Sequence, residues 1–376
     1  MTPAPSTVWL SQPSRFAGVP RDRARWALLL LVTLLAATLL ALRAPGPAPA
    51  TGDPGERAQE GTDIVLYETI VARVRHGENY HEAAADALRT GDYPLKPFVT
   101  FRLPTLAVVQ ARLPERGSTV LLYALALAVA LAWWRRLAPA FKRALPKVVA
   151  FLLLGGGMLV FVQSELAFFH EIWAGLLIAL SLALRRPGRW VEAAAFGLAA
   201  ALVRETAALY VGVMGAMAWM EGERREALGW AAAAAVLAVV VAAHAYAVAQ
   251  VVRPLDPASP GWSGLLGFGF FVRTVTSATA LRLLPLVIGA PLVGLALFGW
   301  AAWREPMASR ASGMFAAYAL LLGVAGRADT IYWGLLVAGP LLVGLAFAPD
   351  GLRDLARAAL GDARRRGRIT VRRVVR

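Results

Sequence analysis

The sequence contains no cysteine, and only 17% of its 376 residues are charged, whereas 58% are apolar. The absence of cysteine excludes disulfide bonds and thiolate metal sites, but it does not define the compartment. Low charge with a high apolar fraction is typical of a protein that crosses a membrane several times, rather than of two soluble domains. Walker, GxGxxG, HExxH and serine-elbow motifs are missing from suitable contexts, so no single motif predicts a reaction.

Acidic residues are also scarce, with 24 Asp and Glu against 39 Lys and Arg and a net charge of +15. A chain this basic could bind nucleic acid. Its Arg and Lys, however, fall mainly in short connections beside apolar segments and in the tail, which carries nine arginines after Asp350. Cytosolic retention and contact with anionic lipid headgroups explain that placement. We therefore expect a lipid bilayer around the protein and no nucleic-acid partner.

Ten apolar segments predict ten transmembrane or half-membrane helices. The first could be a signal peptide, because an Ala-Pro-Ala sequence follows at residues 48–50. Its apolar run is longer than a usual signal core and more segments follow, so we predict an uncleaved anchor with a cytosolic N-terminus. The segments are residues 26–42, 119–134, 148–162, 166–184, 191–203, 206–220, 228–252, 281–302, 311–325 and 331–348.

The pair Arg204-Glu205 decides the topology. A single helix over residues 191–220 would place this pair at mid-membrane, which costs several kcal/mol unless the pair faces a cavity. It would also put the arginine-rich tail outside. Two short helices that meet at the pair keep every basic connection in the cytosol, so we predict a break there. The pair would then lie at the outer side.

The resulting organisation has three parts. Residues 1–25 form a cytosolic N-terminal segment, residues 26–348 form the transmembrane domain, and residues 349–376 form a basic cytosolic tail. Both termini are expected in the cytosol of a multi-pass inner-membrane protein. The long polar loop at residues 43–117 is expected outside, on the periplasmic face.

This outer loop is predicted to fold into three interfacial helices. Thr62 or Asp63 can cap the first helix, in which Leu66, Ile70 and Val74 follow a 3.6-residue period. Asn79 with Glu82 predicts a cap for the second helix, and Gly91 its end. The third helix is expected near residues 104–113.

With this topology, unusual polar residues converge on the outer face. Carboxylates can accept a proton or bind sugar hydroxyls, and arginines can bind phosphate oxygens through two hydrogen bonds. These functions are needed when a hydroxyl displaces a lipid phosphate. The candidate residues are Asp63, Lys96, Arg102, His170, Glu171, Arg204, Glu205, Arg327 and Asp329.

Structural explanations exist for each of these residues. Arg204-Glu205 and Arg327 with Asp329 can be ion pairs that close helix ends, and Asp63 can be only a helix cap. Glu171 at a helix start is favoured by the helix dipole without any catalysis. The three consecutive glycines from Gly155 are expected to allow close helix packing.

The layout resembles the GT-C superfamily of membrane glycosyltransferases: a cytosolic N-terminus, one span, and a long outer loop with an acid just after that span. The motifs that carry the resemblance are similar to those of bacterial members that are mannosyltransferase-like or uncharacterised. They are Asp63-Ile-Val-Leu-Tyr67, Gly77-Glu78-Asn79-Tyr80, Arg102-Leu103-Pro104, His170-Glu171 and Arg204-Glu205.

The resemblance, over residues 24–349, implies transfer of a sugar from a polyprenyl-phosphate carrier to an acceptor at the outer face. It makes Asp63 the base; the acids there, Glu60 and Asp63, are three residues apart rather than adjacent. We expect inverting displacement, with Arg204, Arg327 and either Lys96 or Arg102 neutralising the phosphate. No residue pattern supports a cofactor; a divalent metal stays open. A transporter or flippase of a lipid-linked or polar substrate and a non-catalytic assembly protein are the alternatives.

Overall fold

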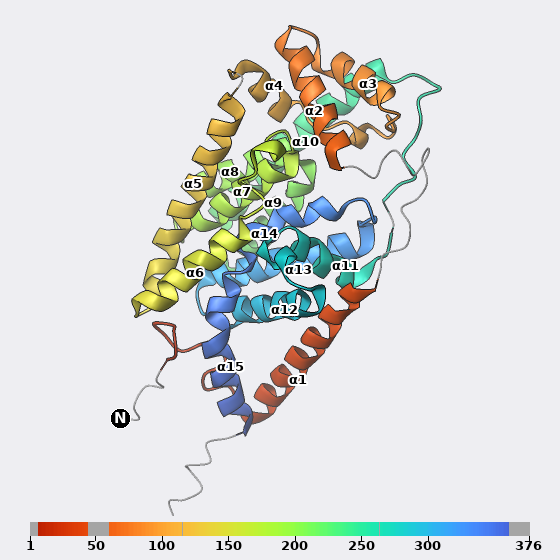
Figure 1. Ribbon diagram of the computed structural model, residues 1–376. Coiled ribbons are helices and arrows are strands. Elements are labelled where there is room, and N and C mark those ends of the chain that lie inside the picture. The colour runs from red at the N-terminus through yellow and green to blue at the C-terminus, as the bar shows by residue number, and fades with distance from the viewer. Residues whose placement is uncertain (1–6, 44–59, 115, 263, 361–376) are drawn as a thin grey trace, which may run out of the picture.

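The computed structural model describes residues 7–43, 60–114, 116–262 and 264–360, and every regular element within them is a helix. The molecule is elongated, with α2 to α4 at one end and α1 and α15 at the other (Figure 1). The all-helical expectation is confirmed for these residues. The bounds are α1 Arg21–Thr38, α2 Glu60–Arg75, α3 Tyr80–Thr90, α4 Thr105–Arg112, α5 Gly117–Leu137, α6 Ala144–Gly157, α7 His170–Leu184, α8 Val191–Val203, α9 Ala208–Met220, α10 Arg224–Val251, α11 Gly267–Ser277, α12 Leu286–Ala302, α13 Pro306–Ala325, α14 Leu335–Leu341 and α15 Gly344–Leu360.

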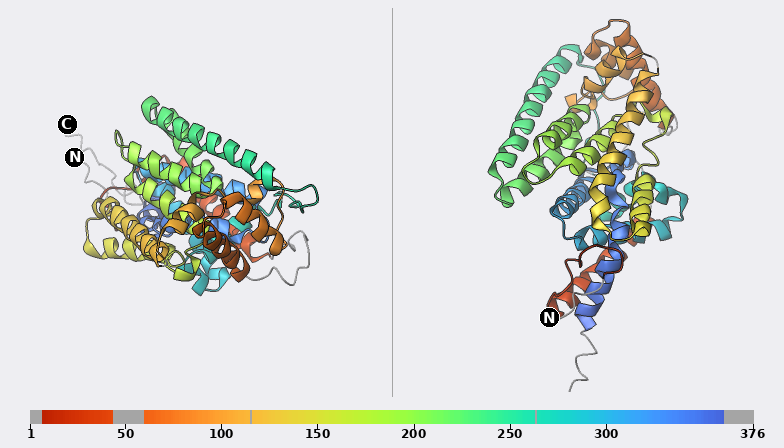
Figure 2. Two further views of the ribbon diagram at one scale, coloured as in Figure 1. Left: turned by 90° about the horizontal axis from the view of Figure 1, so that it is seen from above. Right: turned by 90° about the vertical axis from the view of Figure 1, so that its left-hand side faces the viewer.

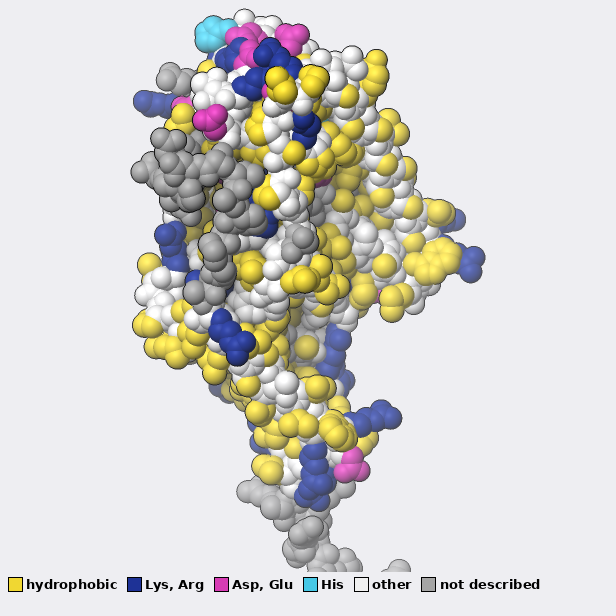
Figure 3. All heavy atoms as spheres, turned by 90° about the vertical axis from the view of Figure 1, so that its right-hand side faces the viewer, with side chains coloured by type: hydrophobic (Ala, Val, Ile, Leu, Met, Phe, Trp, Pro, Cys, Tyr) yellow, Lys and Arg dark blue, Asp and Glu magenta, His cyan; other side chains and the backbone are white. Residues whose placement is uncertain are grey.

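Four of the described helices are long and apolar enough to cross a membrane: Arg21–Leu42, Gly117–Ala140, Arg224–Val251 and Pro306–Ala325. A fifth candidate is the pair Ile331–Leu341 and Gly344–Leu360, which is bent by 66°. Large apolar side chains on these helices are exposed, and in Figure 3 acidic side chains gather mainly at the upper end of the face, whereas hydrophobic side chains cover much of its middle. These are features of a membrane-embedded helical protein.

The ten predicted apolar segments each overlap a helix or that bent pair, with ends that differ by several residues in either direction. Several, including α6, α7, α8 and α12, are shorter than an upright span needs. Figure 2 shows α10 along one side of the molecule, where it packs against α8 and α9. The described part of the chain therefore combines long helices with a group of short ones.

The three helices predicted in the outer loop are present as α2, α3 and α4. The Asn79 side chain accepts the N–H of His81 at 2.9 Å, and Gly91 follows the last residue of α3, so both predicted ends are confirmed. Leu66 and Ile70 are buried on the predicted face of α2. We call α2 to α4 the cap; it packs on α8 and α10.

The break predicted at Arg204 is confirmed. Helix α8 ends at Val203, Arg204 has extended backbone angles of φ −141° and ψ 110°, and a short 3-10 turn, Glu205–Ala207, leads into α9. The close packing expected at the glycine triplet applies to Gly157: an added Cβ would lie 2.2 Å from the carbonyl oxygen of Gly339. A Cβ on Gly155 would meet nothing within 4 Å.

The described part of the N-terminal segment is folded against α15. The Asp350 carboxylate accepts the backbone N–H groups of Val8, Trp9 and Leu10 at 2.6, 2.7 and 2.8 Å. Asp354 likewise accepts both the N–H and the hydroxyl of Ser14. Helix α15 runs past the boundary expected at residue 348, and residues 361–376 of the expected tail lie outside the described residues.

Two arginines assigned to basic connections are not at lipid headgroups. Arg185 is 1% exposed and Arg310 is 0% exposed. Arg185 pairs with Glu226 at 2.7 Å, and Arg310 pairs with Glu221 at 2.5 Å. The expectation was wrong for these two residues because acids on α10 and at the end of α9 approach them from other parts of the chain.

The topology can be tested with single cysteines, because the natural chain has none. We expect a membrane-impermeant maleimide to label Glu82→Cys and Ala328→Cys in intact cells, and Glu223→Cys only after permeabilisation. Glu223 is exposed between α9 and α10, and its neighbour Gly222 is unsuitable because its φ is +80°. Labelling of Glu223→Cys from outside would contradict the proposed orientation.

Candidate functional site

Asp63 lies in the first turn of α2, where it is half-buried and accepts a hydrogen bond from the Tyr93 hydroxyl at 2.7 Å. The prediction that Thr62 or Asp63 is the N-terminal capping residue of α2 is wrong, since the helix already begins at Glu60. The side chains of residues 60–62, including Glu60, lie outside the described part.

Burial raises the pKa of the Asp63 carboxyl, while the Tyr93 hydrogen bond and the charge of Arg102 lower it less strongly. Glu171 and Asp329 are close enough to add to the increase. A helix N-terminus alone would keep the carboxylate ionised, so burial acts against that expectation. A carboxylate with a raised pKa is a stronger base than an ordinary aspartate.

Arg102 is held between the cap and the spans. It sits in extended chain ahead of α4, between the buried residues Phe101 and Leu103. Its Nε donates to the Tyr67 hydroxyl at 3.1 Å, and its Nη2 lies 3.9 Å from Oε1 of Glu171. The Arg102 side chain stays 13% exposed. The protein therefore orients this guanidinium but leaves some of its N–H donors without a hydrogen-bond acceptor in the described part of the chain.

Arg204 is held more tightly. Its Nε lies 2.5 Å from Oε1 of Glu171, and Nη1 pairs with Glu205. The guanidinium also lies 5.7 Å from the ring centroid of Trp333. Arg204 is 2% exposed, so its charge is compensated inside the protein rather than presented at headgroup depth.

His170 and Glu171 begin α7 and are buried, at 3% and 0% exposure. The His170 ring packs edge-on against Tyr67, with centroids 4.8 Å apart. Both ring nitrogens of His170 and Oε2 of Glu171 have no hydrogen-bond partner among the described residues. Glu171 thus connects Arg102 on the cap side with Arg204 at the helix break.

The remaining predicted site residues lie around this network. Arg327 pairs with Asp329 and donates to Ser259 Oγ at 3.2 Å, which suits the structural explanation of an ion pair closing a helix end. Asp329 still acts electrostatically on Asp63. Lys96 donates to the backbone carbonyl of Pro254 at 2.9 Å, a contact that involves none of the site's arginines.

Sequence reasoning missed the aromatic side chains that orient the site. The Tyr67 hydroxyl accepts a hydrogen bond from Arg102, and the Tyr93 hydroxyl donates one to Asp63. The Tyr332 ring packs edge-on against Phe169, with ring centroids 5.1 Å apart. Tyr67 stands in a motif that carries the family resemblance, and Tyr93 lies in the same outer loop; a hydroxyl close to charged residues was the available signal. Among the described residues, no three His, Asp or Glu side chains are placed to hold a metal ion.

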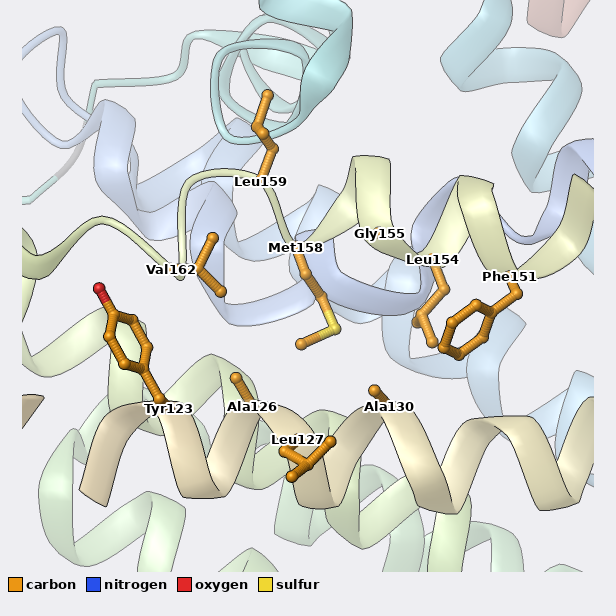
Figure 4. Close-up of a pocket in the computed structure, with 10 residues that line it drawn as sticks. All are labelled: Tyr123, Ala126, Leu127, Ala130, Phe151, Leu154, Gly155, Met158, Leu159 and Val162. Carbon is orange, nitrogen blue, oxygen red and sulfur yellow. The ribbon is translucent and has the colours of Figure 1, made fainter. Parts of the chain in front are cut away.

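An apolar groove of about 400 Å³ runs between α5 and α6 (Figure 4). Ala126 and Ala130 of α5 face Met158 and Leu154 across it, Tyr123 and Val162 lie at one end, and Phe151 lies at the other. The chain continues from Val162 through one turn to His170 and Glu171. The groove and the charged network are thus joined by one short segment.

The fold and the site define a class: an all-helical, membrane-embedded protein with a buried network of carboxylates and arginines beneath a helical cap. Comparison with family models, with curated proteins and with solved structures gives no match to this chain.

Proposed function

We propose that the protein is a membrane glycosyltransferase that moves a sugar from a polyprenyl-phosphate carrier to an acceptor hydroxyl at the outer face. One observation carries the proposal: the Asp63 carboxylate accepts a hydrogen bond from the Tyr93 hydroxyl at 2.7 Å within range of the charge of Arg102, a guanidinium that is held by the Tyr67 hydroxyl and stays partly exposed. The carboxylate can take a proton and the guanidinium can hold a phosphate, and both come from the loop expected outside.

In the proposed reaction, the acceptor oxygen forms a bond to the anomeric carbon as the bond from that carbon to the phosphate oxygen breaks. The acceptor proton moves to the Asp63 carboxylate, and the leaving phosphate keeps the electron pair. A single displacement of this kind inverts the configuration at the sugar. The developing charge on phosphate is stabilised by a fixed cation, which is typically the largest single contribution to catalysis.

Arg102 is the better phosphate ligand of the two arginines that contact Glu171. Arg204 already contacts Glu171 and Glu205, whereas Arg102 is exposed in part and has only a neutral hydroxyl within hydrogen-bond distance. The apolar groove between α5 and α6 offers room for part of an isoprenoid chain next to the segment that carries His170. Arg204 would then position Glu171 rather than contact the donor.

The test is transfer by the purified protein from a panel of polyprenyl-phosphate sugars. Arg102→Gln should reduce transfer by at least about tenfold, and Arg102→Lys should recover only part, because a point charge replaces a planar fork. Arg112→Gln is the matched control, since Arg112 is exposed on α4 of the same cap. Equal loss in the control would argue against a phosphate contact by Arg102.

A transporter is the second candidate. It is supported by buried charges away from the site, at the C-terminal end of α7 and near the N-terminal end of α13. Arg185 and Arg310 share Glu221 and Glu226 there. Ionisable residues inside a membrane often line a substrate or proton pathway. Absence of transfer from every donor, together with movement of the lipid-linked sugar across proteoliposomes, would favour this alternative.

A further inference from the structure

A polar cavity of about 220 Å³ lies beside the turn that follows α5. This end of α5 is the one farther from the cap (Figure 1). Its walls come from three distant parts of the chain. They are residues 10–13 of the N-terminal segment, Arg136 with the turn after α5, and Arg304 with Glu305 between α12 and α13. The cavity holds the volume of about seven waters at roughly 30 Å³ each, which is enough for a phosphate group and a few waters.

The N-terminal wall of this cavity is anchored. The N–H and the hydroxyl of Ser11 donate to the carbonyls of Ala140 and Pro139 at 2.7 and 3.0 Å. Just before it, the Asp350 carboxylate binds three consecutive backbone N–H groups. This wall of the cavity is therefore held in place by hydrogen bonds to two other parts of the chain.

Arg136 has no hydrogen-bonded or ion-paired oxygen among the described residues, and Glu305 acts on its charge only from a longer distance. Arg136 is half-buried, and its one hydrogen-bond partner is the thioether sulfur of Met307, 3.4 Å from Nε. Among the described arginines that are buried or half-buried, Arg136 alone lacks an oxygen partner. A thioether is only a weak acceptor, so both terminal nitrogens remain available to an anion.

The other charges of the cavity leave it positive. Arg304 donates to the backbone carbonyls of Ser14 and Ala17 at 3.0 and 3.3 Å, which leaves its charge unpaired. Arg304 and Glu305 are exposed; Glu305 lines the cavity and acts on the charge of Arg136, but it forms no direct ion pair with either arginine among the described residues. Two positive charges against one negative charge give a net +1.

We infer that this cavity binds a phosphate group between Arg136 and Arg304. A phosphodiester carries one negative charge and would neutralise the cavity, and its oxygens suit the planar fork of a guanidinium. The phosphate can belong to an anionic phospholipid of the adjoining leaflet or to a soluble phosphate. Exposed Trp134, two residues before Arg136, is of the type that lies at membrane interfaces.

The test uses the full-length protein in phosphatidylcholine nanodiscs, with phosphatidylglycerol added to the bilayer or inorganic phosphate added to the buffer. Thermal unfolding and native mass spectrometry report binding. Arg136→Gln should weaken phosphatidylglycerol binding by about tenfold or more, as expected for lost hydrogen bonds to a charged group. Arg135→Gln is the control, because Arg135 is exposed and does not line the cavity.

The two probes, phosphatidylglycerol and inorganic phosphate, distinguish a lipid phosphate from a soluble one. Stabilisation by phosphatidylglycerol that depends on Arg136 and not on Arg135 supports a lipid phosphate. The same dependence with inorganic phosphate, and none with phosphatidylglycerol, supports a soluble one. The inference is overturned if neither probe stabilises the protein, or if Arg136→Gln responds as the unmodified chain does. None of these outcomes depends on glycosyl transfer.

Discussion

Replacing Asp63 with Asn is expected to slow sugar transfer by about 10²- to 10⁴-fold, the usual contribution of a general base. An asparagine cannot accept the hydroxyl proton. Its side-chain oxygen can still accept the hydrogen bond that Tyr93 now donates to Asp63 at 2.7 Å, so the cap should remain folded. The measurement is initial transfer rate with purified variants that show the same thermal unfolding.

Glu68→Gln is the matched control, since Glu68 is an exposed acid on the same helix. It should leave the rate unchanged. Normal turnover by Asp63→Asn would remove Asp63 as the base, whereas absence of transfer by the unmodified protein from every donor would favour the transporter and assembly alternatives.

The pH profile gives an independent prediction for the same carboxyl. The base must be unprotonated, so activity should fall as pH drops through its pKa. Because burial raises the pKa of Asp63, this acid limb should lie above the range of an ordinary aspartate. The Tyr93 hydrogen bond lowers that pKa, so Tyr93→Phe should move the limb to still higher pH. A limb that moves to lower pH would contradict the assignment.

Arg204→Gln is expected to destabilise the protein by about 3–5 kcal/mol, the usual cost of removing one partner of a buried ion pair. Glu171 is 0% exposed, and its Oε1 lies 2.5 Å from Nε of Arg204. Without Arg204 this carboxylate would stay buried, with Arg102 3.9 Å away as its nearest cation. Unfolding in detergent or nanodiscs, followed by heat or denaturant, measures the loss.

The double variant Arg204→Gln with Glu171→Gln should be more stable than the sum of the two single effects predicts, because it removes both charges together. Arg189→Gln, an exposed arginine between α7 and α8, should change stability little. Transfer should fall at least about tenfold in Arg204→Gln even where the protein is folded, because Glu171 loses its position, and Arg204→Lys should recover only part. Strictly additive stabilities would show that the pair is not coupled.

Much of the fold could be predicted because the signals were local. Asn79 caps α3 through a hydrogen bond two residues away, and Gly91 ends the same helix. The break at Arg204 followed from the cost of a charge inside an apolar run. The start of α2 was predicted wrongly because Thr62 and Asp63 are good caps, whereas the helix extends back to Glu60. Capping preference alone does not locate a helix end.

The sequence by itself determined that this is a helical membrane protein, that its long polar loop folds into three helices, and that acids and bases gather at particular connections. Tertiary structure alone decided which charges are paired and which are free. Arg204 meets Glu171 across 33 residues, and Arg310 meets Glu221 across 89. Arg135 and Arg136 are neighbours, yet only Arg136 faces the cavity. Helix packing sets such partners, because it brings together side chains whose separation along the chain carries no local signal.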